Sequence, residues 1–193
     1  MDGILQAFIT LFVIMDPLGN IPLFISLTKG MPTKEIRRTF NNSIVVAAIL
    51  LFVFLFFGLE VLNLFGINLN SFQIAGGILL LIIGIMYVLG ISNRYLTPES
   101  HDLTVPIGTP LLTGPGVITT IIIIVKEYDT AIAVEAAIIT LFLSWVILMC
   151  SVRLYKILGE HWTAIISRVM GIILSAIAVE FIVNGILNIV RMV

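Results

Sequence analysis

The chain has 193 residues, of which 60% are hydrophobic and 11% charged, with a formal net charge of -1 and a mean hydropathy of +1.19. So few polar side chains cannot coat a soluble domain of this size, and the chain is therefore expected to be an integral membrane protein. The near-neutral charge gives no basic surface for nucleic acid, and the single cysteine, Cys150, allows neither a disulfide framework nor a thiolate metal site.

Six apolar segments long enough to cross a bilayer follow one another along the chain. Each has about 20 residues or more, the length that a hydrocarbon core roughly 30 Å thick requires. The predicted spans are residues 3–27, 42–65, 71–91, 105–125, 131–154 and 165–189. The connections between them are too short for a soluble domain, so a single transmembrane domain over residues 1–193 is expected.

The first span is interrupted near its middle. The interruption reads Asp16-Pro17-Leu18-Gly19-Asn20-Ile21-Pro22. Its prolines remove backbone donors and its glycine loosens the backbone, so the helix should break here, near the bilayer midplane, and resume after Pro22. Broken backbone at that depth is tolerated only where protein buries it or a water-filled cavity receives it. A purely structural alternative is that Asp16 caps a helix whose first residue is Pro17.

The fourth span carries a similar interruption, which runs from Gly108 to Gly116. The last four residues of this interruption, Thr113 to Gly116, contain both glycine and proline. Interrupted spans at corresponding positions of two halves are the best sequence indication of a transporter's binding site. If the helices resume after Asn20 and Gly116, two positive helix ends with free N–H groups point toward the centre from opposite sides.

The halves also show traces of a duplication. Aligning Gly19 with Gly116 superposes the two interruptions, and nearly the same shift lays residues 72–76 over residues 167–171. Three spans per half give the halves opposite orientations, as in an inverted repeat. The expected fold is an all-α polytopic membrane protein of six helices, with the first and fourth broken at the midplane. The expected repeats cover about residues 1–95 and 100–193.

Basic residues set the expected orientation, because Lys and Arg in short loops stay in the cytoplasm. Eight of the ten lie on one side, and only Lys126 and Arg191 lie on the other. Both termini of this multi-pass protein are therefore expected outside the cytoplasm.

Small residues lie on one face of the third span, at Gly77 and Gly84, and of the sixth, at Gly171, Ser175 and Ala178. Small faces let helix backbones approach closely in a membrane, so we expect these faces to be helix contacts.

Four motifs occur in order along the chain: residues 16–22 (DPLGNIP), 65–77 (beginning FGINL and ending IAGG), 113–119 (TGPGVIT) and 168–171 (RVMG). Together they resemble the MarC family of prokaryotic inner-membrane proteins, and the likeness runs from about Phe8 to Asn188. The resemblance implies six spans and, by analogy with SnatA-type members, transport of small neutral amino acids such as glycine and alanine. Two positions depart from the family pattern. Gln73 stands where Arg is common in the family, and Glu180 stands where a neutral amide is common.

The resulting expectation is a secondary transporter of glycine and alanine across the cell (inner) membrane by alternating access, coupled to a proton or sodium ion. The helix ends and hydroxyls would bind the substrate carboxylate, and Asp16 or freed carbonyls its ammonium. The candidate substrate-binding residues are Asp16, Pro17, Gly19, Asn20, Pro22, Thr113, Gly114, Pro115, Gly116 and Thr119.

The roles of the two intramembrane acids stay open. Asp16 is a candidate cap, ammonium partner or proton carrier, since a proton can cancel its charge. Glu180 is a second candidate for ion coupling, and its alternative role is a hydrogen bond to another helix, such as one that carries Asn or Ser.

Other classes of protein are less consistent with these residues. A channel or efflux protein for another small solute is one alternative, because broken polar helices also form selectivity filters. A membrane accessory subunit, whose breaks serve assembly, is another. An enzyme is not expected, because the chain has no His-Glu-x-x-His motif and Asp16 is the only aspartate deep in a span. Neither a cofactor nor a metal is expected, and the oligomeric state is left open.

Overall fold

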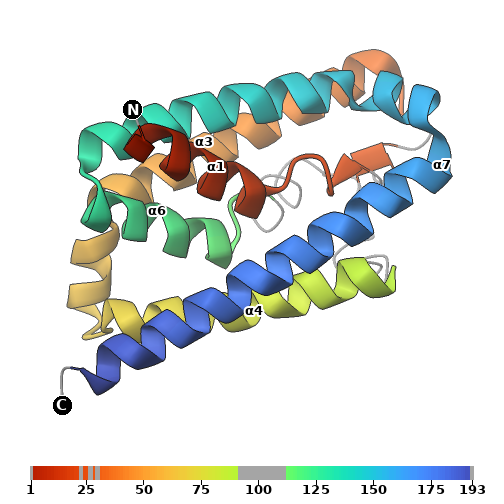
Figure 1. Ribbon diagram of the computed structural model, residues 1–193. Helices are drawn as coiled ribbons and strands as arrows, with labels where there is room; N and C mark the ends of the chain where they lie inside the picture. Colours follow the sequence, from red (N-terminus) through yellow and green to blue (C-terminus); the bar gives the residue numbers. More distant parts are fainter. Residues whose placement is uncertain (1, 22–23, 26–27, 29–30, 91–111, 192–193) are drawn as a thin grey trace.

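The computed structural model describes residues 2–21, 24–25, 28, 31–90 and 112–191. Regular structure in these ranges is helical (Figure 1). Its helices are α1 (Asp2–Met15), α3 (Thr33–Leu64), α4 (Leu69–Leu89), α6 (Pro115–Glu127) and α7 (Thr130–Val190).

The long helix α7 consists of two arms joined by a single residue. Gly159 has φ 76° and ψ 172°, a conformation outside the helical region that is essentially restricted to glycine. The chain turns back there, so that the first arm (residues 130–158) and the second arm (residues 160–190) form a hairpin, as Figure 1 shows. These arms correspond to the fifth and sixth predicted spans.

Four helical stretches are long and apolar enough to cross a membrane: Thr33–Leu64, Leu69–Leu89, Thr130–Ser151 and His161–Val190. They correspond to the second, third, fifth and sixth predicted spans. A shorter apolar helix, Gly3–Met15, lies at the start of the first predicted span. The chain is therefore a polytopic helical membrane protein.

Two of the predicted connections between spans are largely helical. The polar segment before the second predicted span belongs to α3, which begins at Thr33 and has exposed side chains at Lys34 and Arg37. With 32 residues, α3 is about 48 Å long at 1.5 Å per residue and exceeds the hydrocarbon thickness. The predicted loop at residues 155–164 is likewise helical except at Gly159. Hydropathy locates the end of the apolar region, whereas the helix continues into the polar interface.

The two predicted interruptions are described to different extents. Helix α1 ends at Met15 and residues 17–20 form a turn, so the helix breaks where the sequence predicts. Helix α6 begins at Pro115, and the earlier part of the fourth predicted span, residues 105–111, lies outside the described residues. Pro22 also lies outside them.

The small-residue faces of the third and sixth spans are helix contacts, as predicted, and the structure shows that they contact each other. A Cβ on Gly77 would lie 2.8 Å from the carbonyl oxygen of Ala178, and one on Gly84 would lie 2.7 Å from that of Gly171. The residue numbers of these contacts increase along α4 and decrease along α7. The helix α4 and the second arm of α7 are therefore antiparallel neighbours (Figure 1).

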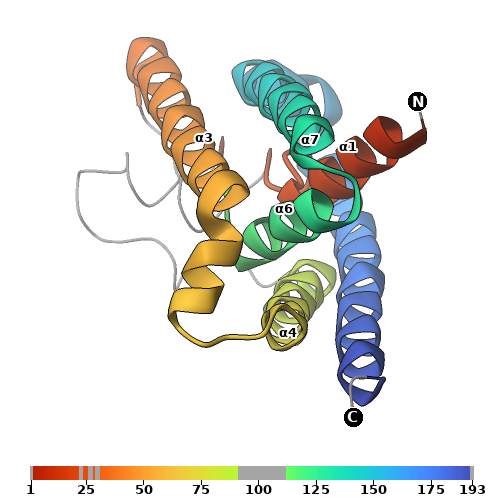
Figure 2. The ribbon, with the colours of Figure 1, turned by 90° about the vertical axis from the view of Figure 1, so that its left-hand side faces the viewer.

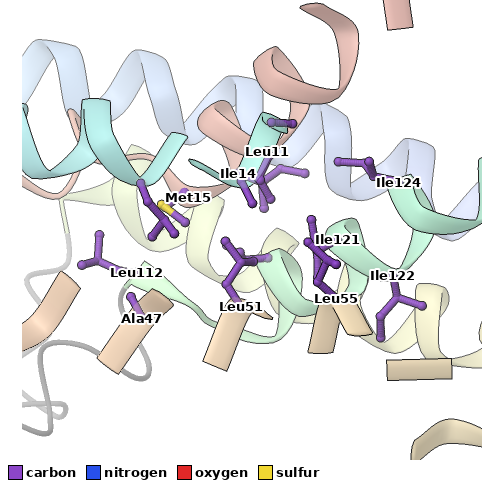
Figure 3. Close-up of a cluster of buried hydrophobic side chains, with 14 of the residues drawn as sticks. Leu11, Ile14, Met15, Ala47, Leu51, Leu55, Leu112, Ile121, Ile122 and Ile124 are labelled. Atoms are coloured by element: carbon purple, nitrogen blue, oxygen red, sulfur yellow. The ribbon is translucent and has the colours of Figure 1, made fainter. Parts of the chain in front are cut away.

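The short helices α1 and α6 lie between the long ones (Figure 2). Their buried side chains meet those of α3 in one apolar cluster, in which Leu11 and Met15 of α1 lie near Leu51 of α3 and Ile121 of α6 (Figure 3). Large apolar side chains such as Phe142 are exposed on the outside, where lipid would cover them. The end of α1 and the start of α6 are therefore held in the interior.

Candidate functional site

The turn after α1 is organised by Asp16. Its backbone is in the left-handed region at φ 45°, which Asp tolerates better than most residues. Carboxylate oxygen Oδ1 accepts a hydrogen bond from the Gly19 amide at 2.9 Å, and the Asp16 carbonyl accepts one from the Asn20 amide at 3.2 Å. Oδ1 thus caps the turn of residues 17–20 in the way an N-cap side chain caps a helix, whereas the sequence alternative had a helix starting at Pro17.

The cap uses only one of the two carboxylate oxygens. Asp16 is buried at 2% exposure, and among the described residues no group donates a hydrogen bond to Oδ2. A buried carboxylate oxygen without a partner costs considerable free energy unless a proton, a cation or an ammonium group satisfies it. Asp16 can therefore act as a cap through Oδ1 and as a binding group through Oδ2.

Side chains of two other helices hold the same turn. The Tyr87 hydroxyl of α4 donates to Oδ1 of Asn20, whose amide nitrogen donates to the Asp16 carbonyl at 2.8 Å. On the other side, the Ser167 hydroxyl of α7 donates to the Gly19 carbonyl at 2.8 Å. The turn is thus tied to both helices of the antiparallel pair.

The second contribution comes from the start of α6. Gly114 is its N-cap residue and Pro115 occupies the first helical position, so the N-cap residue itself has no side chain that could cap the first turn. The amides there carry the partial positive charge of a helix N-terminus, a ready site for a carboxylate. A Cβ on Gly116 would overlap the side chain of Leu80, so only glycine permits this approach of α6 to α4.

The turn and the start of α6 meet at a cavity of about 30 Å³. Its lining residues are Ile14, Met15, Asp16, Asn20, Leu80, Ile83, Tyr87, Gly114, Gly116, Val117 and Leu174. This volume is about that of one water in the liquid and is too small for an amino acid. The structure therefore shows the site without room for an amino acid.

Of the ten predicted substrate-binding residues, Pro22 lies outside the described residues and the other nine fall into three groups. Asp16, Asn20, Gly114 and Gly116 line the cavity. Pro17 and Gly19 belong to the turn that holds Asp16, but they are not among the lining residues.

Thr113, Pro115 and Thr119 also lie outside the cavity lining. The Thr113 hydroxyl donates to the Ala47 carbonyl at 3.1 Å, and the Thr119 hydroxyl donates to the Pro115 carbonyl at 2.8 Å. Pro115 itself is exposed. The threonines thus bond to backbone, and Thr113 ties the start of α6 to α3.

Glu180 is not brought to this cavity. It is exposed on the second arm of α7, and its Oε1 accepts a hydrogen bond from Asn184 at 3.0 Å, one turn further along the same helix. The sequence suggested a hydrogen bond to another helix, whereas the partner found here lies on the same helix as Glu180.

Sequence reasoning missed several cavity residues, notably Tyr87, Leu80 and Leu174. The leucines give no signal within apolar helices. Tyr87 does, because a hydroxyl deep in an apolar helix needs a hydrogen-bond partner. Ser167, which holds the turn from outside the cavity, was likewise not predicted as part of the site.

These observations define a class: a polytopic helical membrane protein with a small, mainly apolar cavity that a buried acid and a helix N-terminus both line. Comparison with known proteins gives the family. The family model described as "MarC family integral membrane protein" matches residues 1–190. The chain belongs to the MarC family.

Relatives match along nearly their whole lengths. Membrane protein MJ1677 of Methanocaldococcus jannaschii is 35% identical, over 93% of this chain and 94% of its own. A membrane protein of Buchnera aphidicola subsp. Baizongia pistaciae is 34% identical, over 92% of this chain and 89% of its own. The inner membrane protein YhgN of Escherichia coli (strain K12) is 31% identical, over 96% of this chain and 97% of its own. No solved structure matches the chain significantly.

Proposed function

We propose that the chain is a secondary transporter that moves small neutral amino acids, such as glycine and alanine, across the cytoplasmic membrane by alternating access. The observation that carries this proposal is the pairing of two opposite binding groups at one buried cavity. The unpartnered Oδ2 of Asp16 suits an ammonium group, and the uncapped start of α6 suits a carboxylate. A free amino acid carries both groups a short distance apart.

The walls of the cavity favour a substrate with a small side chain. Gly114 and Gly116 bring backbone to its surface, and Leu80 fills the space against Gly116. Because the closed cavity holds about one water, every added substrate atom requires further separation of the helices. Glycine and alanine need the least separation, which supports them over larger solutes.

Alternating access requires two arrangements of the helices around this cavity. An inverted repeat supplies them, because either half can move against the other. Two features support such a repeat: α4 and the second arm of α7 are antiparallel, and helix ends from both halves meet at the cavity. In this proposal both termini lie outside the cytoplasm.

We place ion coupling at Asp16. Asp16 lines the cavity and its Oδ2 has no hydrogen-bond partner among the described residues, so a proton or sodium ion bound to Oδ2 would compete or cooperate with the substrate ammonium. Glu180 was the other candidate, but its exposed carboxylate already accepts a hydrogen bond from Asn184 and lies outside the cavity lining. The geometry favours Asp16.

Uptake of radiolabelled glycine and alanine by liposomes containing the purified chain tests the proposal. We expect saturable uptake that an imposed proton or sodium gradient stimulates. Asp16→Asn keeps the shape but removes the charge, and should abolish that stimulation. Glu135→Gln is the matched control, because Glu135 is an exposed acid of α7 that does not line the cavity.

Three outcomes would contradict the proposal. Normal gradient-stimulated uptake by Asp16→Asn at every pH would remove the assigned role of this acid. Ohmic current without saturable uptake would identify a channel. A correctly inserted chain that takes up neither amino acid under either gradient would favour another solute or an accessory subunit.

A further inference from the structure

A second and larger cavity opens on the surface of the protein, away from Asp16. It lies between the C-terminal half of α3, helix α6 and the start of α7, and its volume is about 230 Å³. Leu55 and Ile122, both buried, form its floor, while Phe54 and the exposed Phe56 line it on α3. We call this cavity the α3–α6 groove.

The floor of the groove is closed by a close contact between helices. A Cβ on Gly58 would lie 2.7 Å from Cδ1 of Ile122, so α3 and α6 approach closely at this glycine. Leu55, one turn earlier on α3, and Ile121 of α6 belong to the same buried cluster (Figure 3). The groove is therefore a depression on a packed surface. It shares no lining residue with the Asp16 cavity.

One end of the groove is polar. Glu60 and Thr130 line it there, and both side chains are exposed. Glu60 is near the end of α3 and Thr130 is the first residue of α7. Figure 1 places the ends of α3 and α6 and the start of α7 on the same side of the molecule.

The apolar part extends deeper into the membrane. Phe56 and Phe54 precede Glu60 on α3 by four and six residues, which places them about 6 and 9 Å further along the helix. If Glu60 lies at headgroup depth, these aromatic side chains lie at the depth of acyl chains. The groove thus has the polarity of a lipid molecule, with a polar end at the interface and an apolar channel below it.

The charge at the polar end selects the headgroup. Among the described residues nothing pairs with the Glu60 carboxylate, and Glu127 and Asp129 add two more exposed acids between the end of α6 and Thr130. Lys126, in the last turn of α6, is the neighbouring cation. An anionic headgroup would meet like charge at Glu60, whereas an ammonium group would form a charge-assisted hydrogen bond with it.

We propose that the α3–α6 groove is a binding site for a bilayer lipid with a primary-amine headgroup, such as phosphatidylethanolamine. The ammonium group binds the Glu60 carboxylate and the Thr130 hydroxyl, and an acyl chain lies along Phe54 and Phe56. The lipid phosphate remains on the side of Lys126. This site is separate from the Asp16 cavity and does not depend on the transport proposal.

Native mass spectrometry of the purified full-length chain, released from nanodiscs of equal phosphatidylethanolamine and phosphatidylglycerol, tests the assignment. We expect the wild type to retain phosphatidylethanolamine about tenfold over phosphatidylglycerol, a ratio that corresponds to 1.4 kcal/mol. Glu60→Gln should reduce the ratio to near one. Glu135→Gln, which removes an exposed acid near the same end of α7 outside the groove, should keep it.

A second variant separates headgroup selection from chain binding. Val125 lines the groove and is half-buried, so Val125→Phe should fill it and lower retention of both lipids. Equal retention of the two lipids by the wild type would overturn the proposal, as would an unchanged ratio in Glu60→Gln. Lipid-free dimers whose formation Val125→Phe disrupts would assign the groove to a second copy of the chain instead.

Discussion

The hydrogen bond from Tyr87 to Asn20 connects α4 to the turn that holds Asp16, and its removal gives a measurable prediction. Tyr87→Phe keeps the ring and removes only the hydroxyl. Asn20 is buried at 3% exposure, so its Oδ1 is left without the donor that satisfies it. The Asn20 amide nitrogen keeps its bond to the Asp16 carbonyl at 2.8 Å, which restrains the side chain from turning to another partner.

Two general magnitudes bound the expected loss of stability. Bonds between membrane helices contribute about 0.6 kcal/mol on average and about 1.7 kcal/mol at most in double-mutant cycles. A buried polar atom left without a partner costs about 1–3 kcal/mol. We therefore expect Tyr87→Phe to lower the free energy of unfolding by about 1–2 kcal/mol.

Equilibrium unfolding in mixed micelles, followed by the fluorescence of Trp145 and Trp162, measures this change. The control is Tyr128→Phe, which removes a hydroxyl that bonds no described residue and should change stability by less than about 0.5 kcal/mol. A cycle of Tyr87→Phe, Asn20→Ala and the double variant isolates the pair. A coupling energy near zero would refute the reasoning, because the bond would then contribute nothing in the membrane.

Two further substitutions test close contacts. Gly84→Ala places a Cβ 2.7 Å from the Gly171 carbonyl oxygen, so we expect thermal unfolding to show a loss of about 1–3 kcal/mol in the free energy of unfolding. In the control, Gly3→Ala, the new Cβ meets only a side chain at 3.2 Å and should lower the free energy of unfolding by less. Equal losses in the two variants would contradict the contact. Gly19→Ala places a Cβ 2.7 Å from Cγ of Asp16, so the carboxylate must move, and we expect amino acid uptake by correctly inserted protein to fall about tenfold or more; unchanged uptake would show that its position is not critical.

The break after α1 could be predicted because its residues act locally. Pro17 and Gly19 disfavour a continuous helix through their own backbone chemistry, and Asp16 caps best where a helix begins. The contact between α4 and the second arm of α7 was predictable for a similar reason. Small residues at helical spacing lie on one face of a helix and predict that this face contacts another helix. Gly84 and Gly171, which lie on two such faces, contact each other.

The remaining features depend on packing that no local pattern encodes. Leu80 is one leucine among many, and only its position against Gly116 makes it a cavity wall. Glu180 illustrates the opposite error, since depth in an apolar segment suggested a functional acid while the fold exposes it beside Asn184. Hydropathy also could not locate the start of α3, because a helix can extend beyond the lipid.

The single-residue joint at Gly159 has a consequence for biogenesis. A single non-helical residue joins the two arms that contain the last two spans, so we expect these spans to enter the bilayer together as a helical hairpin. In the orientation proposed above, with both termini outside the cytoplasm, we expect the basic residues on either side of the hairpin tip, Arg153 and Arg168, to hold the tip in the cytoplasm. A longer chain segment at Gly159 would uncouple the two insertion events, so the brevity of this joint helps fix the orientation of the C-terminal half during synthesis.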